Sequence, residues 1–160
     1  DQLRIYLEME RCGYPRILCV QNGYNLLEGA RFPEEDVLQF CAQSGTMLVA
    51  WSPLGAGLLT DRYLDPGKVG KGDRLVDENT LEKKLTPENK ERLQRLHKLS
   101  QNWGLSISQI ALAYMMSLPG MGPVIPSATK LEHLEANAKA GTIELDPQQR
   151  LQIAEALSSS

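Results

Sequence analysis

The sequence has too few of several residue types for some common kinds of site. Its only histidines are His97 and His133, and its three cysteines lack the spacing of metal ligands, which argues against a zinc site. A net charge of −3 gives no electrostatic reason to expect a nucleic acid or an anionic membrane as partner. The apolar runs are far shorter than the roughly 20 residues that a bilayer span needs. No basic segment followed by an apolar one opens the chain, so we expect a cytoplasmic protein without a membrane partner.

Size and composition are those of one ordinary domain. The 160 residues are 42% hydrophobic and 23% charged, which suits a single domain with a real core. Cys12, Cys19 and Cys41 are odd in number, and two of them lie on apolar segments, so we expect buried, reduced thiols. The first residue is Asp1, inside a predicted helix, which indicates a fragment or a processed chain.

The stretch from Thr46 to Thr60 is the most informative. Met47–Trp51 is apolar throughout, as a strand of a parallel sheet covered on both faces must be. Pro53 ends it, and Gly55 and Gly57 allow a sharp turn or a close approach to a ligand. Ligands of such sheets bind just beyond the C-terminal ends of the strands. The alternative interpretation is a loop with two convenient glycines.

Further strands and helices follow from periodicity and from turn residues. Two more short strands are predicted, at Ile17–Val20, followed by a polar turn over Gln21–Asn25, and at Pro123–Pro126. Because helices separate the strands, we expect right-handed parallel crossovers and an α/β fold. We expect a long surface loop over 61–85, where no period is visible. The predicted helices are Asp1–Cys12, Pro33–Ser44 with proline at its first position, Pro87–Trp103 capped by Thr86, Ile107–Leu118, Ser127–Asn137 and a last one from Asp146 to about Leu157.

Two helix starts have the pattern of a capping box, in which two residues three apart cap each other's backbone. The pairs are Ser106 with Gln109 and Thr129 with Glu132. Asp146 and Gln149, at the same spacing, open the last predicted helix.

Each predicted strand end carries polar or aromatic residues that suit a nucleotide. These are Gln21, Asn22 and Tyr24 after the first strand, Trp51, Ser52 and Leu54 after the second, and Ser127–Thr129 after the third. The last group opens a helix, whose free N–H groups and dipole favour an anion. Each residue also has a simpler explanation, since Gln21 could cap a turn, Trp51 could belong to the core and Thr129 caps a helix without any ligand. Their coincidence at one rim favours a nucleotide cofactor.

Three motifs together resemble those of the aldo-keto reductases. They are Val20–Leu27, Trp51–Leu59 with Arg62–Tyr63, and Val124–Thr129 with Asn137. The likeness is to the branch with potassium-channel β subunits and bacterial Tas-like reductases, and it runs over nearly the whole chain. It implies the C-terminal portion of a (β/α)₈ TIM barrel, with residues 1–160 as a single incomplete NADP-dependent oxidoreductase domain.

The resemblance also assigns cofactor-binding roles. At the nicotinamide end, Gln21 hydrogen-bonds the carboxamide and Trp51 stacks on the ring. The remaining positions, which line the phosphates, the 2′-phosphate pocket and the adenosine, are Ser52, Pro53, Leu54, Gly57, Arg62, Arg74, Ser127, Thr129, His133 and Asn137.

Three positions depart from the family pattern. Ser127 replaces a glycine and would restrict the backbone. His133 replaces an arginine or glutamine and is a weaker partner for a 2′-phosphate at neutral pH. Asp61 replaces a small residue, and its charge would oppose a phosphate. NADP is still favoured over NAD.

The family's catalytic aspartate, tyrosine, lysine and histidine lie in the first half of the barrel, and nothing here matches them, so we assign no catalytic residue. The implied chemistry is hydride transfer from NADPH to a small aldehyde or ketone. A non-catalytic nucleotide-sensing subunit and an inactive truncated product are the alternatives. Three strands cannot close a barrel. We therefore expect exposed sheet edges and an exposed apolar inner face, with self-association or a missing N-terminal half to cover them.

Overall fold

The protein is described here by a computed structural model, which covers residues 2–30 and 37–158. Within these residues one sheet has the strand order β2-β1-β3-β4. β1 (Cys19–Asn25), β3 (Met47–Trp51) and β4 (Met121–Ile125) are parallel, and β2 (Gly29–Ala30) pairs antiparallel with the end of β1. The fold is α/β with an unclosed parallel sheet, as predicted for a portion of a (β/α)₈ barrel.

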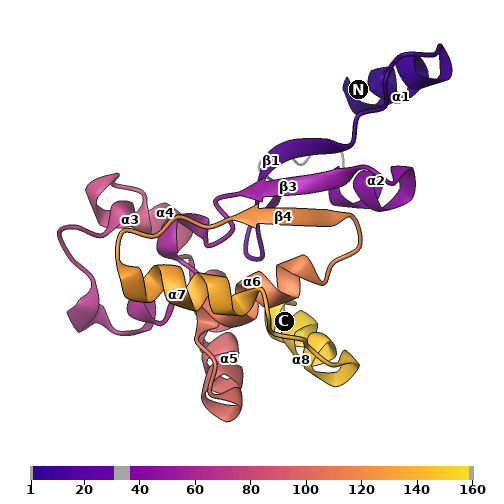
Figure 1. The fold of residues 1–160 in the computed structure, drawn as a ribbon. Coiled ribbons are helices and arrows are strands. Elements are labelled where there is room, and N and C mark those ends of the chain that lie inside the picture. Colours follow the sequence, from indigo (N-terminus) through magenta and orange to yellow (C-terminus); the bar gives the residue numbers. More distant parts are fainter. Residues whose placement is uncertain (1, 31–36, 159–160) are drawn as a thin grey trace.

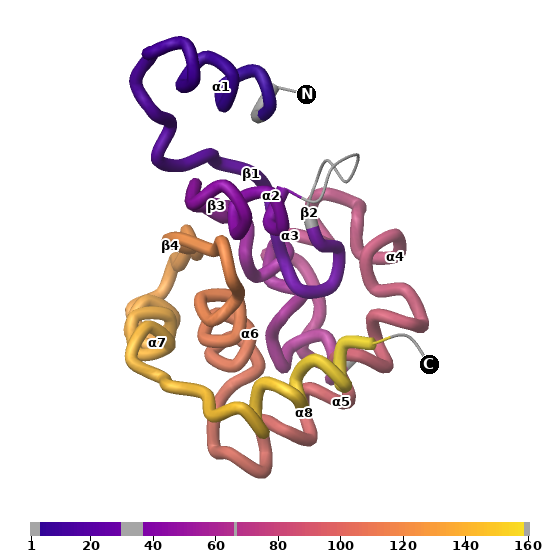
Figure 2. Tube along the Cα trace, turned by 90° about the vertical axis from the view of Figure 1, so that its right-hand side faces the viewer, coloured from indigo at the N-terminus to yellow at the C-terminus, as the bar shows by residue number. Residues whose placement is uncertain are grey.

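Helices flank this sheet (Figure 1). Near the arrowhead ends of the strands lie the short elements that follow β3, while α1 projects from the other end. Figure 2 shows α8 running alongside α5, which it contacts. The α-helices are α1 (Gln2–Arg11), α2 (Val37–Ser44), α3 (Arg74–Asp77), α4 (Leu81–Lys84), α5 (Pro87–Trp103), α6 (Ile107–Met116), α7 (Leu131–Ala140) and α8 (Pro147–Leu157); the 3₁₀ helices are η1 (Gly55–Gly57), η2 (Asp61–Leu64) and η3 (Pro66–Lys68). The predicted start of the second helix at Pro33 lies outside the described residues.

One of the two predicted capping boxes is confirmed, and a further one starts α8. Ser106 Oγ accepts from the Gln109 N–H at 3.2 Å, and Gln109 Oε1 accepts from the Ser106 N–H at 3.0 Å. Asp146 and Gln149 make the same exchange at 2.8 and 3.0 Å. These contacts satisfy N–H groups that have no partner within the helix.

The other predicted box, at Thr129 and Glu132, is wrong. α7 begins at Leu131, its N-cap is Lys130, and no side chain caps it. One residue, Lys130, separates the predicted cap from the first helical residue, so the Thr129 side chain is out of register with the first turn.

The first strand is longer than predicted. Cys19–Gly23 pairs with Met47–Trp51, and the strand continues to Asn25, so the predicted turn over Gln21–Asn25 is wrong. A strand with one open face needs apolar residues on its other face only, which leaves no continuous apolar run to recognise. The turn follows the strand, where Asn25 Oδ1 accepts from the N–H groups of Leu27 and Glu28, each at 3.0 Å.

The segment 61–85 is not the irregular surface loop predicted for it. It contains η2, η3, α3 and α4. Two of its side chains, Tyr63 and Leu75, are buried in the hydrophobic core. Helical elements of three or four residues are too short to show a hydrophobic period, so the pattern could not reveal them.

Among the described residues, two groups of buried side chains form the core. The larger one, the main core, lies among η1, η2, α3, α5, α6 and α8, and includes Leu58, Leu75, Leu93, Ile110 and Ile153. The smaller one joins α2 to the sheet through Val37, Cys41 and Leu48, with Val20 and Tyr24 packed against it. α2 therefore covers one face of the sheet near β1 and β3.

The cysteine prediction is half right. Cys12, Cys19 and Cys41 are all free thiols, but Cys41 alone of them is buried. Burial raises the pKa of the Cys41 thiol. Cys19 was expected in the core and is exposed instead, because it lies on the strand face opposite α2.

The other face of the sheet is open, as expected. Met47 is 46% exposed and Ile125 is 49% exposed. Leu131 and Leu134 of α7 are also exposed, as is Ile5 of α1. Over the described residues, no helix combines the length and apolar character of a membrane span, and no cluster of three or more metal-ligating side chains occurs.

Candidate functional site

Gln21 and Trp51 lie on the same face of the sheet. In the parallel pairing Gln21 is opposite Val49, and Gly23 is opposite Trp51. Because side chains alternate along a strand, Gln21, Val49 and Trp51 face away from α2. Gln21 is exposed and Trp51 is half-buried. The predicted amide and the predicted aromatic are thus brought together on neighbouring strands.

Asn22 and Tyr24 do not join them, although both were expected at the same rim. They alternate with Gln21 and face α2, where Tyr24 packs against Val37 and Cys41. The correction follows from the longer strand, since a strand separates neighbouring residues onto opposite faces.

The chain turns sharply after β3, with two non-glycine residues in the left-handed region. Ser52 and Ala56 both have φ 57°, next to Gly55 at φ 57° and Gly57 at φ 96°. Such backbone costs about 1–3 kcal/mol per non-glycine residue and clusters at functional sites. Sequence reasoning identified the glycines but missed Ala56, because nothing in the residue type signals the strain.

Two side chains anchor this turn to the core. Pro53 is fully buried, and Leu54 is partly buried and packs against the main core. The turn is closed by hydrogen bonds from the Gly55 N–H to Ser52 O at 2.9 Å and from the Gly57 N–H to Leu54 O at 3.0 Å.

Arg62 follows this turn and forms an ion pair with Asp73 through Nη1 and Oδ1. The Asp73 side chain is 6% exposed and that of Arg62 is 39% exposed. Asp73 Oδ2 also accepts from the Gly70 N–H at 2.9 Å. Sequence reasoning missed Asp73, and the only signal for it was its place directly before Arg74.

The Arg62 charge also acts on its neighbour Tyr63, which is buried beside η1. Burial raises the pKa of the Tyr63 hydroxyl, while the Arg62 charge and a backbone hydrogen bond from Leu75 act in the opposite direction. A Cβ on Gly57 would lie 3.9 Å from the hydroxyl oxygen. Tyr63 therefore joins the turn after β3 to α3.

Two charged residues of the same segment have partners of their own. Arg74 Nε donates to Glu78 Oε1 at 2.7 Å, and the Arg74 side chain is 65% exposed. Asp61 Oδ1 lies 3.0 Å from His97 Nδ1 on α5. The Asp61 carboxylate, which we expected to oppose a phosphate, is thus in contact with α5.

The third group of predicted residues follows β4. Ile125 pairs with Trp51, so the chain leaves the sheet at the level of the aromatic. Ser127 and Thr129 are exposed before α7. Ser127 does not have a positive φ, so the serine fits there without the backbone restriction expected from the missing glycine.

Within α7, His133 is exposed and Asn137 is half-buried. His133 Nε2 lies 3.9 Å from Glu132 Oε1. Because α7 has no side-chain cap, its first turn offers backbone N–H groups toward the segment that follows β4.

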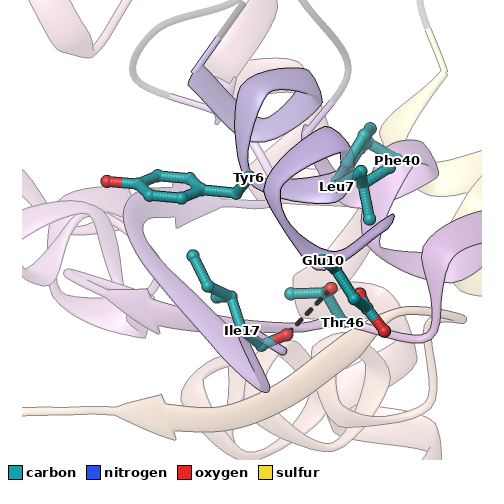
Figure 3. A pocket seen from close by; sticks show the side chains of 6 residues that line it. All are labelled: Tyr6, Leu7, Glu10, Ile17, Phe40 and Thr46. Atoms are coloured by element: carbon teal, nitrogen blue, oxygen red, sulfur yellow. Dashed lines mark hydrogen bonds between the residues drawn. The ribbon is translucent and has the colours of Figure 1, made fainter. Parts of the chain in front are cut away.

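Hollows among the described residues lie away from these positions. One, of about 10 Å³, lies between α1 and α2. Figure 3 shows the side chains that line it, among them Thr46, whose Oγ1 donates to Ile17 O at 3.4 Å. It has room for about one water. A larger hollow of about 570 Å³ lies along α5 beside Leu64 and His97. Neither of these two is lined by a predicted cofactor residue.

A family model described as "Aldo/keto reductase family" matches residues 3–158. Protein tas of Escherichia coli is 32% identical over 135 residues, which cover 82% of this chain and 37% of that protein. A putative voltage-gated potassium channel subunit beta of Schizosaccharomyces pombe is 35% identical over 125 residues, 75% of this chain and 36% of that one.

Among solved structures, a thermostable aldo-keto reductase, Tm1743, crystallised with the inhibitor epalrestat, matches with a TM-score of 0.60 and 28% identity. The match covers 89% of this chain and 40% of that one. This chain thus spans well under half the length of these relatives. Both the branch and the barrel type expected from the motifs are confirmed. The chain belongs to the aldo/keto reductase family, whose members are oxidoreductases that generally use NAD(P)H.

Proposed function

We propose that this chain binds NADP(H) at the ends of β1, β3 and β4. It would supply the cofactor-binding half of an enzyme that reduces aldehydes or ketones by hydride transfer. Residues 1–160 then form a single, incomplete NADP-dependent domain. The observation that supports this most is the shared open face of Gln21 and Trp51, directly beside the strained turn that follows β3.

The nicotinamide end of the cofactor would lie on this face. The Gln21 amide has both a donor and an acceptor for a carboxamide, and the half-buried Trp51 indole offers a flat apolar surface for a ring. When bound, the cofactor supplies the hydride, and this chain orients it. None of its residues is proposed as the proton donor.

The phosphates would lie between the turn after β3 and the start of α7. On one side are Ser52, Leu54 and Gly57, with Pro53 shaping the turn from the core, and Arg62 supplies a positive charge. On the other side, the start of α7 has no side-chain cap, which leaves N–H groups and the positive end of the helix dipole for an anion.

The residues proposed for the adenosine end belong to α7, α3 and the segment before α7. Ser127, Thr129 and His133 would hold the 2′-phosphate and Asn137 the adenine, and all four lie along one stretch of chain after β4. Arg74, whose side chain is 65% exposed, would cover the adenosine from the segment 61–85.

The open face would be covered by the remaining strands of the barrel. Exposed apolar residues on the sheet and on α7, such as Met47, Ile125 and Leu131, are where a closed barrel would have neighbours. A separate N-terminal half, or self-association of this chain, would bury them.

The test is a titration of this chain with NADPH, followed by tryptophan fluorescence. Trp51 and Trp103 are the two tryptophans, and Trp103 packs against the main core from α5. We expect saturating quenching at micromolar NADPH that Trp51→Phe abolishes and Trp103→Phe keeps. Quenching that does not saturate, or that depends on Trp103, would contradict the proposal, and weaker binding of NADH would support the 2′-phosphate site.

A second candidate is a non-catalytic, nucleotide-sensing subunit. It is favoured by the similarity to relatives described as potassium channel β subunits. Because both functions use the same cofactor site, binding does not distinguish them, and only catalytic turnover does. When the chain is combined with an N-terminal half of a relative, reduction of a carbonyl compound with consumption of NADPH would favour the enzyme.

A further inference from the structure

Asp73 is a buried carboxylate to which neither the motifs nor the proposed cofactor site gives a role. Its side chain is 6% exposed, and it pairs with Arg62 eleven residues earlier in the sequence. A carboxylate is rarely buried without partners, because removing its charge from water is unfavourable. Here Arg62 and the Gly70 N–H, at 2.9 Å, both supply hydrogen bonds.

This pair fixes a part of the chain that lies directly against the candidate phosphate site. α3 contacts η1, the turn that follows Trp51. Leu75 is fully buried in the same core against which Leu54 and Ala56 pack. Asp73, immediately before α3, therefore holds the Arg62 side chain at a defined place beside the turn.

The pair still leaves Arg62 able to bind an anion. The structure joins Nη1 to Asp73, whereas the side chain as a whole remains 39% exposed. A guanidinium has five N–H donors in a rigid fork, so one carboxylate does not use them all. A free arginine loses considerable rotamer freedom when it binds a phosphate, and an arginine already held in place loses less.

We infer that Asp73 is a positioning residue, which pre-orients Arg62 for the phosphates of a dinucleotide. This inference rests on the proposed function. The inference goes beyond the proposed function because it gives Asp73 a part in cofactor affinity, although a carboxylate by itself repels a phosphate. If charge alone mattered, removing Asp73 would strengthen binding. If positioning matters more, removing it weakens binding.

The test compares two carboxylates of the same segment. Asp73→Asn keeps the shape and an acceptor for the Gly70 N–H, but it removes the charge that holds Arg62. Asp77→Asn is the matched control, because Asp77 Oδ1 accepts from the Gly72 N–H at 3.2 Å but is exposed and not paired with Arg62. NADPH affinity is measured by fluorescence titration, and folding by circular dichroism.

We expect Asp73→Asn to raise the Kd for NADPH about fivefold, the loss expected when one arginine side chain must be ordered on binding. Asp77→Asn should change it less than twofold. In an Arg62→Gln background, Asp73→Asn should have almost no further effect. Such a double-mutant cycle separates positioning from a structural role. If Asp73 had only a structural role, Asp73→Asn would weaken NADPH binding equally in both backgrounds, and that result would overturn the inference.

An unchanged or lower Kd in Asp73→Asn would likewise overturn the inference while leaving the proposed function intact. Absence of NADPH binding by the unaltered chain would overturn both. If Asp73→Asn does not fold, Arg62→Lys replaces it in the test, because lysine keeps the charge but lacks the planar fork. An Arg62→Lys variant that binds NADPH as tightly as the unaltered chain would then refute the positioning role.

Discussion

Gly120 is the position where one methyl group should damage the fold most, because it brings β4 against α2. A Cβ built on Gly120 would lie 2.4 Å from Ala42 N and 2.7 Å from Leu38 O, both backbone atoms of α2. The residue also has φ 81°, and its carbonyl accepts from the Leu48 N–H at 2.8 Å, the hydrogen bond that starts the β3–β4 pairing. Backbone cannot move aside as a flexible side chain can.

The size of the effect follows from two terms. Placing an alanine in the left-handed region costs about 1–2 kcal/mol, and forcing a methyl into a packed contact costs about 1–3 kcal/mol more. The sum of about 2–5 kcal/mol is a large part of a typical unfolding free energy of roughly 5–15 kcal/mol. For a chain of this size, Tm should fall by roughly 5–15 °C.

The assay is thermal and urea unfolding of Gly120→Ala, followed by circular dichroism. Gly104→Ala is the control, since Gly104 has φ 64° at the end of α5 but no atom within 4 Å of a built Cβ. The control variant therefore has the energetic cost of the left-handed backbone but not the steric clash. Equal losses of stability in the two variants would refute the close approach of β4 and α2.

Three further predictions concern caps, thiols and a buried phenol. Ser106→Ala should lower the unfolding free energy by about 1 kcal/mol, measured by urea denaturation, because it removes the capping box of α6. A thiol reagent such as DTNB should label the exposed Cys12 and Cys19 rapidly, and Cys41, buried and with a raised pKa, only on unfolding. Burial raises the pKa of Tyr63 above its ordinary value of 10.0. Above pH 10.0 the unfolded state therefore loses the phenol proton more readily than the folded state, and the unfolding free energy should fall as pH rises. In urea unfolding measured across this pH range, Tyr63→Phe should make that fall smaller.

Local chemistry in the sequence was enough to place most helices. The caps at Thr86, Ser106 and Asp146 act on the first turn of their own helix, so they are readable without knowledge of the fold. The cap at Thr129 failed because α7 starts one residue later than the motif indicates. A capping motif therefore marks a helix nearby rather than its first residue.

The errors at the strands have a different cause. Cys19 and Tyr24 were placed on the wrong sides because their faces depend on the length of β1 and on α2, which packs against one side only. Asp73 was missed because its partner Arg62 is remote in sequence. Contacts between distant residues and the strain at Ala56 leave no mark in a single sequence, since they arise only when the chain is folded.

The resemblance and the geometry support different parts of the proposed site. The motifs named which residues would meet a cofactor, but they could not say whether a chain with an unclosed sheet still places them together. The pairing of Trp51 with Gly23 on one side and Ile125 on the other answers this for the strand ends, because these hydrogen-bonded neighbours all belong to this chain.

Binding and reaction then have different requirements. The positions of Gln21 and Trp51 depend on strand pairing within the chain, and that of Arg62 on Asp73, so none of them needs the rest of a barrel to be set. Hydride chemistry also needs a proton donor and a surface that excludes water, and the residues that the structure describes leave Met47 and Ile125 exposed on the face proposed for the nicotinamide. Under the proposed function, binding of NADPH is therefore expected of this chain by itself, and turnover is expected only when further strands cover that face.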